Sequence, residues 1–167
     1  MKEQNGRSLL ADVALGAAAG LAGAWLMNQT TTAIYDHQSE ESLEEEHRVR
    51  GGESAYETAA EKAARAFGQE LTKDQKSTAA TAIHWSLGPA AGAIYGALRH
   101  AMPSLGAGSG IAYGLLFWLA VDEGANTALG LTPPPQKFPW QAHARGVAGH
   151  LVLGATIESA FDLFDRA

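Results

Sequence analysis

Residues 88–96 have the sequence GPAAGAIYG, in which glycines stand at positions 88, 92 and 96. Residues four apart lie on the same face of an α-helix, so this stretch predicts a helix with one face free of side chains. Each interior glycine costs a soluble helix roughly 0.5–1 kcal/mol relative to alanine. In a membrane this cost is offset, because small residues let helix backbones approach closely where no hydrophobic effect drives helices together. The stretch therefore favours a membrane helix that packs tightly on another helix.

The same spacing recurs on both sides of this stretch, at Gly16 and Gly20 and at Gly106, Gly110 and Gly114. Apolar segments occupy residues 9–35, 77–101, 107–131 and 143–164. Each segment is long enough to cross a hydrocarbon core roughly 30 Å thick at ~1.5 Å per residue. The sequence therefore predicts an all-α fold, a four-helix transmembrane bundle. A glycine- and alanine-rich soluble bundle is the alternative, and for the first segment so is a cleaved signal peptide.

Charged residues are concentrated between the first two apolar segments. Residues 36–76 contain 17 of the 30 charged residues (11 acidic and 6 basic), whereas the other 126 residues carry 13. A net charge of -6 without a basic stripe excludes nucleic acid as the main partner. The absence of cysteine excludes disulfides, thiolate metal sites and a cysteine nucleophile. We expect a single integral-membrane domain over residues 1–167 with one polar insertion, residues 36–76.

The polar insertion contains one helical stripe. Apolar residues recur at helical spacing at Tyr56, Ala59, Ala60, Ala63, Ala64 and Phe67. They predict an amphipathic surface helix between spans one and two, which ends at Gly68. Thr72 and Gln75 form a capping box that opens the second span. The glutamate-rich run 40–46 is expected to be solvated.

Polar residues in the four spans lie at a similar predicted depth. Asn28 lies seven residues before the end of the first span, His84 seven after the start of the second, Glu123 eight before the end of the third and His150 seven after the start of the fourth. At ~1.5 Å per residue, each lies roughly 10–12 Å below the same membrane surface. Asp122 lies next to Glu123 near this depth. Glu158 lies deeper in the membrane and is expected to extend the polar path across the bundle. Ionisable groups in a membrane normally face the protein interior, so these residues predict a polar intramembrane cluster.

Three interpretations of this cluster stay open. It is a hydrogen-bonded knot that fixes helix register, a proton-responsive site built on histidine and carboxylate, or a metal or haem site. The metal candidates are His84, Glu123 and His150, and the cofactor is unknown. Of the remaining four histidines, His37, His47 and His143 are expected to be exposed and His100, beside Arg99, to lie at the membrane interface. Neither a nucleophile with its base nor a phosphate-binding glycine loop follows from the sequence, so an enzyme is the weaker class.

The loop before the last span carries a motif. Gly130-Leu131-Thr132-Pro133-Pro134 is followed by Pro139-Trp140, then by Gly149-His150-Leu151-Val152 and by Ile157-Glu158. This pattern resembles the YagU-like family of bacterial inner-membrane proteins, and His84 is similar to the histidine of that family's second span. The resemblance covers residues 77–160 best. It implies a multi-pass inner-membrane protein without an assigned activity, and an association with acid tolerance.

Two functional hypotheses follow. The first is a non-enzymatic multi-pass protein of the bacterial inner membrane whose buried histidine–carboxylate cluster responds to protons, in acid stress or ion permeation. The second is a structural or accessory subunit whose small-residue faces bind partner helices, either in a homo-oligomer or on another membrane protein. The lipid bilayer is the expected partner in both.

Overall fold

The computed structural model describes residues 8–166, and those residues form helices and no strand. The helices are α1 (Leu9–Asp36), α2 (Glu40–Arg50), α3 (Ala55–Ala66), α4 (Lys73–Leu98), α5 (Ile111–Trp118), α6 (Asn126–Ala128) and α7 (Trp140–Arg166). Two 3₁₀ turns, η1 (Pro103–Gly106) and η3 (Pro135–Lys137), and a π-helix, η2 (Leu119–Ala125), complete the order. The all-α class is confirmed.

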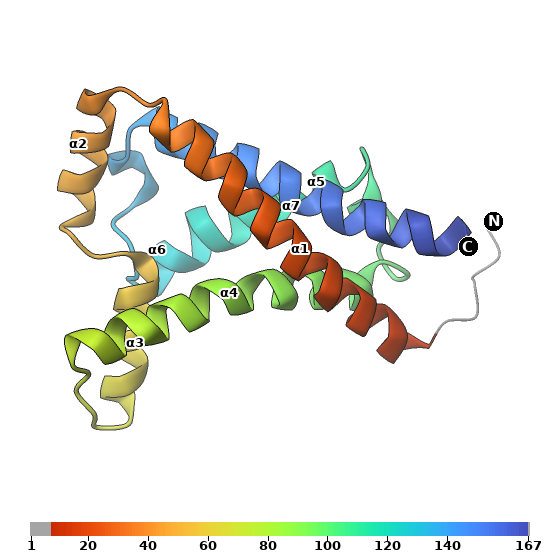
Figure 1. The fold of residues 1–167 in the computed structure, drawn as a ribbon, viewed down its shortest axis with the longest axis horizontal. Helices are drawn as coiled ribbons and strands as arrows, with labels where there is room; N and C mark the ends of the chain where they lie inside the picture. The colour runs from red at the N-terminus through yellow and green to blue at the C-terminus, as the bar shows by residue number, and fades with distance from the viewer. Residues whose placement is uncertain (1–7, 167) are drawn as a thin grey trace.

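The long helices run in alternating directions (Figure 1). α1 contacts both α4 and α7, α5 packs on α7, and α3 packs on α4. The end of α1, the start of α4, α6 and the start of α7 therefore lie at one end of the molecule, together with α2 and α3 (Figure 1). We call this the insertion end. The opposite end holds the start of α1, η1 and the end of α7.

Glycines join α1 to α4 through direct backbone contact. A Cβ atom added at Gly92 would lie 1.8 Å from the Gly16 carbonyl oxygen, and one added at Gly20 would lie 2.1 Å from the Gly88 carbonyl oxygen. Any side chain at these positions would force the two helices apart. The predicted packing role of these two glycine series is therefore confirmed.

A second glycine contact joins α5 to α7. Gly110 precedes α5 with φ +87°, a left-handed conformation, and a Cβ there would lie 2.1 Å from the Gly154 carbonyl oxygen. A Cβ at Gly114 would lie 2.2 Å from the His150 carbonyl oxygen. The buried core fills the space beside these contacts with Tyr95, Tyr113, Leu153, Ile157 and Phe161, among others.

Two of the four predicted spans, α1 and α7, are long and apolar enough to cross a membrane. α4 has 26 residues but does not meet the same test of composition. The third predicted span, residues 107–131, is divided into α5, the π-helix η2 and the short α6. It begins only at Ile111, because residues 108–110 all have positive φ angles.

The polar insertion is more ordered than the sequence predicts. α3 occupies the predicted surface-helix position, and the Thr72–Gln75 capping box is present at the start of α4. Residues 40–46 begin a helix capped by Ser39 and ended by Gly51 at φ +70°, and they are not a disordered turn; as expected for a solvated face, Glu40, Glu41, Glu44 and Glu45 are exposed. Within that helix Glu46 is only 3% exposed, since two arginines pair with it.

We predict that Gly92→Ala lowers the free energy of unfolding by about 1–3 kcal/mol or more, the range typical of overpacking. Alanine favours an isolated helix, but its methyl group would meet the Gly16 carbonyl. Denaturant titration of the purified protein measures the change. Ala90→Leu, on the exposed side of the same helix, is the control and should change the free energy of unfolding little. Equal stability of Gly92→Ala and the native protein would contradict the backbone contact.

Candidate functional site

Two adjacent carboxylates of the π-helix face two histidines of α7. Glu123 Oε1 lies 2.7 Å from His143 Nδ1, and Asp122 Oδ2 lies 3.8 Å from His150 Nδ1. The histidines are seven residues apart, so they lie on one face of α7, two turns from each other. The i→i+5 hydrogen bonding of a π-helix widens the turn, and such segments occur frequently at functional sites.

Asp122, Glu123 and His143 border a cavity of about 200 Å³ at the insertion end. Five elements contribute polar side chains to it: Arg50 from α2, Tyr56 from α3, Asp122 and Glu123 from η2, Asn126 and Thr127 from α6, and His143 from α7. Trp118 and Phe138 add aromatic walls, and Pro133 and Pro135 close it from the loop. We call this cavity with its two carboxylate–histidine pairs the candidate site.

Gly146 makes room for the site on α7. A Cβ added there would lie 2.9 Å from the Trp118 indole nitrogen and 3.8 Å from Asp122 Oδ2. Because position 146 has no side chain, the Trp118 ring and the Asp122 carboxylate reach the surface of α7. The Gly146 carbonyl oxygen also accepts a hydrogen bond from His150 Nδ1 at 2.9 Å.

His143 lies between two acceptors. Its Nδ1 faces the Glu123 carboxylate at 2.7 Å, and its Nε2 faces the Pro135 carbonyl oxygen at 3.1 Å. A neutral imidazole has a single N–H, and neither a carbonyl nor a carboxylate can donate. Both contacts are hydrogen bonds only when a proton is added to the pair, on the second imidazole nitrogen or on Glu123. Both contacts are therefore satisfied only when the His143–Glu123 pair holds one proton more than a neutral imidazole beside a carboxylate.

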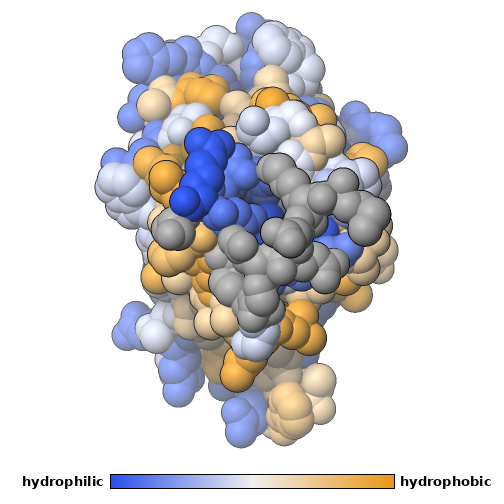
Figure 2. All heavy atoms as spheres, turned by 90° about the vertical axis from the view of Figure 1, so that its right-hand side faces the viewer, coloured by the Kyte–Doolittle hydropathy of each residue, from blue (hydrophilic) through white to orange (hydrophobic). Residues whose placement is uncertain are grey.

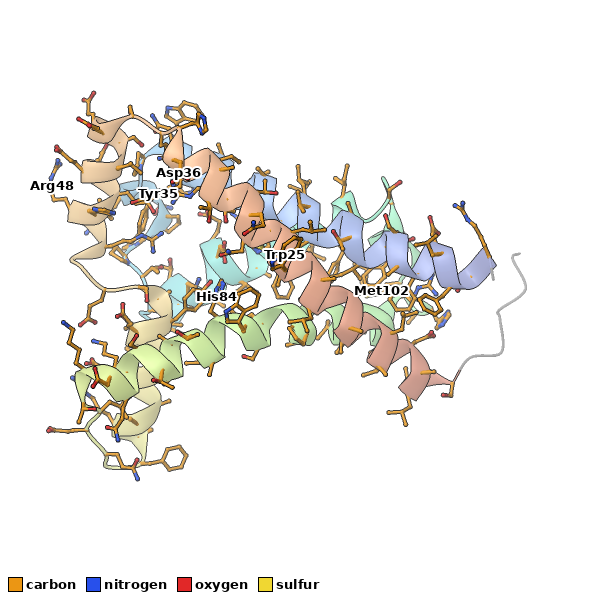
Figure 3. All side chains as sticks on the ribbon, viewed as in Figure 1. Trp25, Tyr35, Asp36, Arg48, His84 and Met102 are labelled. Atoms are coloured by element: carbon orange, nitrogen blue, oxygen red, sulfur yellow. The ribbon has the colours of Figure 1, made fainter. Side chains whose placement is uncertain are left out.

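The structure divides the predicted cluster. Asp122 and His150 lie together, whereas Glu123 bonds to His143, which the sequence places at the surface and the structure finds half-buried. Asn28 and His84 line a separate hollow between α1, α3 and α4. Figure 3 shows His84 extending from α4 toward the middle of the molecule.

Glu158 lies apart from the candidate site, toward the opposite end. It accepts a hydrogen bond from the Tyr95 hydroxyl, and a Cβ at Gly106 would lie 2.7 Å from its Oε1. The same region holds a pair that the sequence analysis missed, in which Asp12 Oδ2 lies 2.6 Å from His100 Nε2. Asp12 is fully buried. A carboxylate inside an apolar helix needs a polar partner, and this requirement was the sequence signal that could have predicted the pair.

The described residues contain no group of three or more His, Asp or Glu side chains that could hold a metal ion. The candidates His84, Glu123 and His150 are separated, because His84 packs against Tyr56, Glu123 bonds to His143 and His150 faces Asp122. The three ligands suggested for a metal or haem therefore lie apart in the structure and face different partners, which corrects the prediction that they form one site.

The loop motif shapes one wall of the site. Gly130 has φ +63°, which favours glycine, and ends the short helix α6. Pro133 lines the cavity, Pro134 is exposed and Pro139 is buried at the start of α7. Trp140 is 72% exposed, as a side chain at a membrane–water interface would be.

A buried ion-pair network beside the site was not predicted. The Arg145 guanidinium of α7 donates to both carboxylate oxygens of Glu46, at 2.7 and 2.8 Å, and to Gln38. Arg50 donates to the same carboxylate at 2.9 and 3.1 Å. The Arg145 guanidinium also stacks over the ring of Tyr35, which lies where α1 meets α2 (Figure 3). Arg145 falls inside a predicted span, where a lone cation requires a partner, and that was the available signal.

The two arginines determine the ionisation of Glu46. Burial alone raises the pKa of this carboxyl, but the hydrogen bonds and charges of Arg145 and Arg50 outweigh burial and hold its pKa below the usual range. Glu46 is therefore ionised wherever the fold is intact near neutral pH, and it fixes α2 to α7.

Comparison with known proteins gives one match. A family model described as protein of unknown function (DUF1440) matches residues 61–159, more than half of the 167 residues. No curated protein and no solved structure matches the chain. The matched region contains His84, both π-helix carboxylates, His143 and His150, whereas α1 and α2 lie outside it.

We predict that Glu46→Gln lowers the free energy of unfolding at pH 7 by roughly 3–5 kcal/mol, because it leaves two arginines without their carboxylate. Since the folded pKa is depressed, the contribution of Glu46 is complete above its unfolded pKa of about 4.3 and is lost as the pH falls through the folded pKa. Stability curves at pH 7 and below pH 4 measure this, and the variant should differ least from the native protein at the lower pH. Glu45→Gln, on the exposed face of α2, is the matched control.

Proposed function

The chain belongs to the DUF1440 family, and we propose that it is a multi-pass membrane protein whose candidate site responds to protons. The observation that carries the proposal is the position of His143 between Glu123 and the Pro135 carbonyl. Loss of the shared proton breaks one of the two bonds. A change in pH then becomes a change in how η2, α7 and the proline loop are held together.

The distribution of side chains supports a lipid environment. Large apolar side chains on α1, α4, the α5–η2 segment and α7 are exposed, whereas the ionisable side chains of Asp12, Glu46 and His150 are buried. The exposed set includes Leu21, Trp25, Trp85, Ile94, Leu115, Leu116, Leu119 and Leu163. Figure 2, which views the end where α1 begins and α7 ends, shows hydrophobic residues exposed among hydrophilic ones. In water such a surface would drive aggregation, whereas acyl chains would cover it.

The proposal extends the two apolar helices to four spans. α4 and the α5–η2–α6 segment pack along α1 and α7 through backbone contacts, so a bilayer that holds α1 and α7 would hold them too. The motif residues 130–134, Pro139, Trp140 and His150 support assignment to the YagU-like proteins, and with it the bacterial inner membrane and a role in acid tolerance.

The packing of the core favours a proton-sensing role over ion permeation. Tyr113, Leu153 and Ile157 are buried, and along α7 Leu153 and Ile157 lie between His150 of the candidate site and Glu158. Neither of these two side chains carries a proton donor or acceptor, which argues against a continuous polar path from the site to Glu158.

The accessory-subunit hypothesis loses one support. The glycine faces offered to partner helices are occupied by helices of the same chain, as Gly16 against Gly92 and Gly110 against Gly154 show. Assembly into a homo-oligomer or with a membrane partner stays a prediction that rests on the exposed apolar side chains.

We predict that Glu123→Gln changes the midpoint of the His143 pH response, because the imidazole loses a carboxylate within hydrogen-bonding distance. ¹⁵N NMR of histidine-labelled protein in lipid nanodiscs measures the midpoint. The control Glu45→Gln should leave it unchanged. The groups that face His143 are Glu123, Asp122, Arg50 and Tyr56, so Asp122→Asn serves as a second, weaker perturbation. If Glu123→Gln leaves the His143 midpoint unchanged, His143 and Glu123 do not share a proton.

At the level of the cell, replacing His143 and His150 together with glutamine should abolish the contribution of this protein to survival at low pH. Neither glutamine can acquire a charge, so the site would be fixed in one state. Survival of strains that express the native or the doubly substituted chain measures this, with His37→Gln as control because His37 is exposed on α1. Equal survival of all strains, with equal protein levels in the membrane, would contradict the proton-sensing function.

A further inference from the structure

Tyr56 separates two polar hollows. It lines the candidate site, and it also lines the hollow that contains Asn28 and His84. The rings of Tyr56 and His84 meet edge to face, with their centroids 5.0 Å apart. Ser54, the residue that caps α3, also lines both hollows, so the Tyr56 ring and Ser54 together form the wall between the two halves of the cluster that the sequence predicted as one.

The hydroxyl of Tyr56 belongs to the same electrostatic environment as the carboxylates. Burial raises the pKa of Tyr56 to about 12, and the negative charge of Asp122 contributes in the same direction. The phenol is therefore neutral at physiological pH, and it can stand beside a carboxylate without repulsion.

α3 is attached to the bundle by weak contacts. Its most buried residue is Ala60, so little apolar surface holds it on α4. Lys62 Nζ donates to the Leu129 carbonyl oxygen at 2.7 Å in an exposed hydrogen bond. Lys76 pairs with Glu53 at 2.6 Å and with Glu61 at 2.9 Å. The Lys76 side chain is 14% exposed, and those of Glu53 and Glu61 are 48% and 31% exposed, so solvent screens these pairs in part and they add only modestly to stability.

α2 differs from α3 in this respect, although both belong to the polar insertion. Its Glu46 carboxylate is buried between Arg145 and Arg50. Between the two helices stand Gly51 and Gly52, with φ angles of +70° and +88°. A Cβ atom at either glycine would meet nothing within 4 Å, so no packing restrains this turn.

We propose that α3 is a hinged lid on the candidate site, with its hinge at Gly51–Gly52 and Tyr56 as the partition that opens when the lid lifts. With the lid closed, the candidate site and the His84 hollow are separate. With the lid raised, they join into one polar chamber that water and protons enter from the insertion end. This inference rests on the proposed function, and it describes how access to the proton-responsive site is regulated.

Distance measurements test the hinge. The chain has no cysteine, so spin labels can be placed in pairs without background. One pair joins the exposed positions Glu45 on α2 and Arg65 on α3, and the control pair joins Glu45 and the exposed Ala144 on α7. Lys62→Met should raise the population with a longer α2–α3 distance roughly five-fold, the change expected for one lost hydrogen bond. The control distance should not change.

Chemical modification tests the partition. Diethylpyrocarbonate acylates neutral imidazole, and mass spectrometry reports each histidine separately. Lys62→Met and Tyr56→Ala should each raise the modification rate of His84 several-fold, while the exposed His37 serves as internal control. Tyr56→Phe keeps the ring and should leave the His84 rate near that of the native protein. If Tyr56→Ala does not fold, Lys62→Met tests the same point with Tyr56 intact.

A single α2–α3 distance together with an unchanged His84 rate in Lys62→Met overturns the lid. The His143 titration, measured on the same samples, keeps this result separate from the proposed function. If the His143 midpoint responds to Glu123→Gln but α3 does not move, the lid is overturned and the proposed function is not. If α3 moves but the His143 midpoint does not respond to Glu123→Gln, the proton-responsive site is overturned and the lid is not.

Discussion

Backbone contact between glycine-lined helices is the constraint on which the rest of the structure depends. Gly16 and Gly20 meet Gly88, Gly92 and Gly96 with no room for a Cβ atom, and α5 meets α7 in the same way. In the proposed bilayer, lipid would be as apolar as leucine, so close packing would have to supply the attraction between such helices. α1 also contacts α7, which joins the two glycine-packed pairs into one bundle. Large apolar side chains are left on the outside as a consequence.

Periodicity predicted the parts of the fold that depend on local pattern. Glycine spacing located the helix contacts, the Tyr56–Phe67 stripe located α3, and Thr72 with Gln75 located the start of α4. The π-helix at Leu119–Ala125 could not be predicted, because the apolar pattern of the third segment does not distinguish it from an α-helix; its two adjacent carboxylates have separate partners on α7. α2 was missed for a similar reason. Its glutamates resemble a solvated run until Arg145, 99 residues away along the chain, is placed beside Glu46.

The candidate site shows what depth along a helix determines and what it leaves open. Counting residues from span ends placed Asn28, His84, Glu123 and His150 at one level, and alternating helix directions bring these segments to one end of the molecule. Depth does not fix rotation about the helix axis. His84 turns toward Tyr56 of α3, and Glu123 turns toward His143. The insertion contributes Arg50 and Tyr56 to the site, and a count confined to the spans could not include them.

The site lies between one wall that is fixed and one that is loosely held, and this asymmetry is informative about mechanism. α2 is fixed to α7 by a buried carboxylate between two arginines, whereas α3 has one buried residue, Ala60, and is otherwise held by half-buried side chains such as Tyr56 and by lysine contacts. Toward the opposite end, tightly packed aliphatic and aromatic side chains stand between the site and Glu158. A path for ions would need polar groups on both sides of that layer to connect, and Leu153 and Ile157 lie between them. A chamber closed at depth and covered by a weakly held helix is instead suited to converting protonation into movement of the insertion.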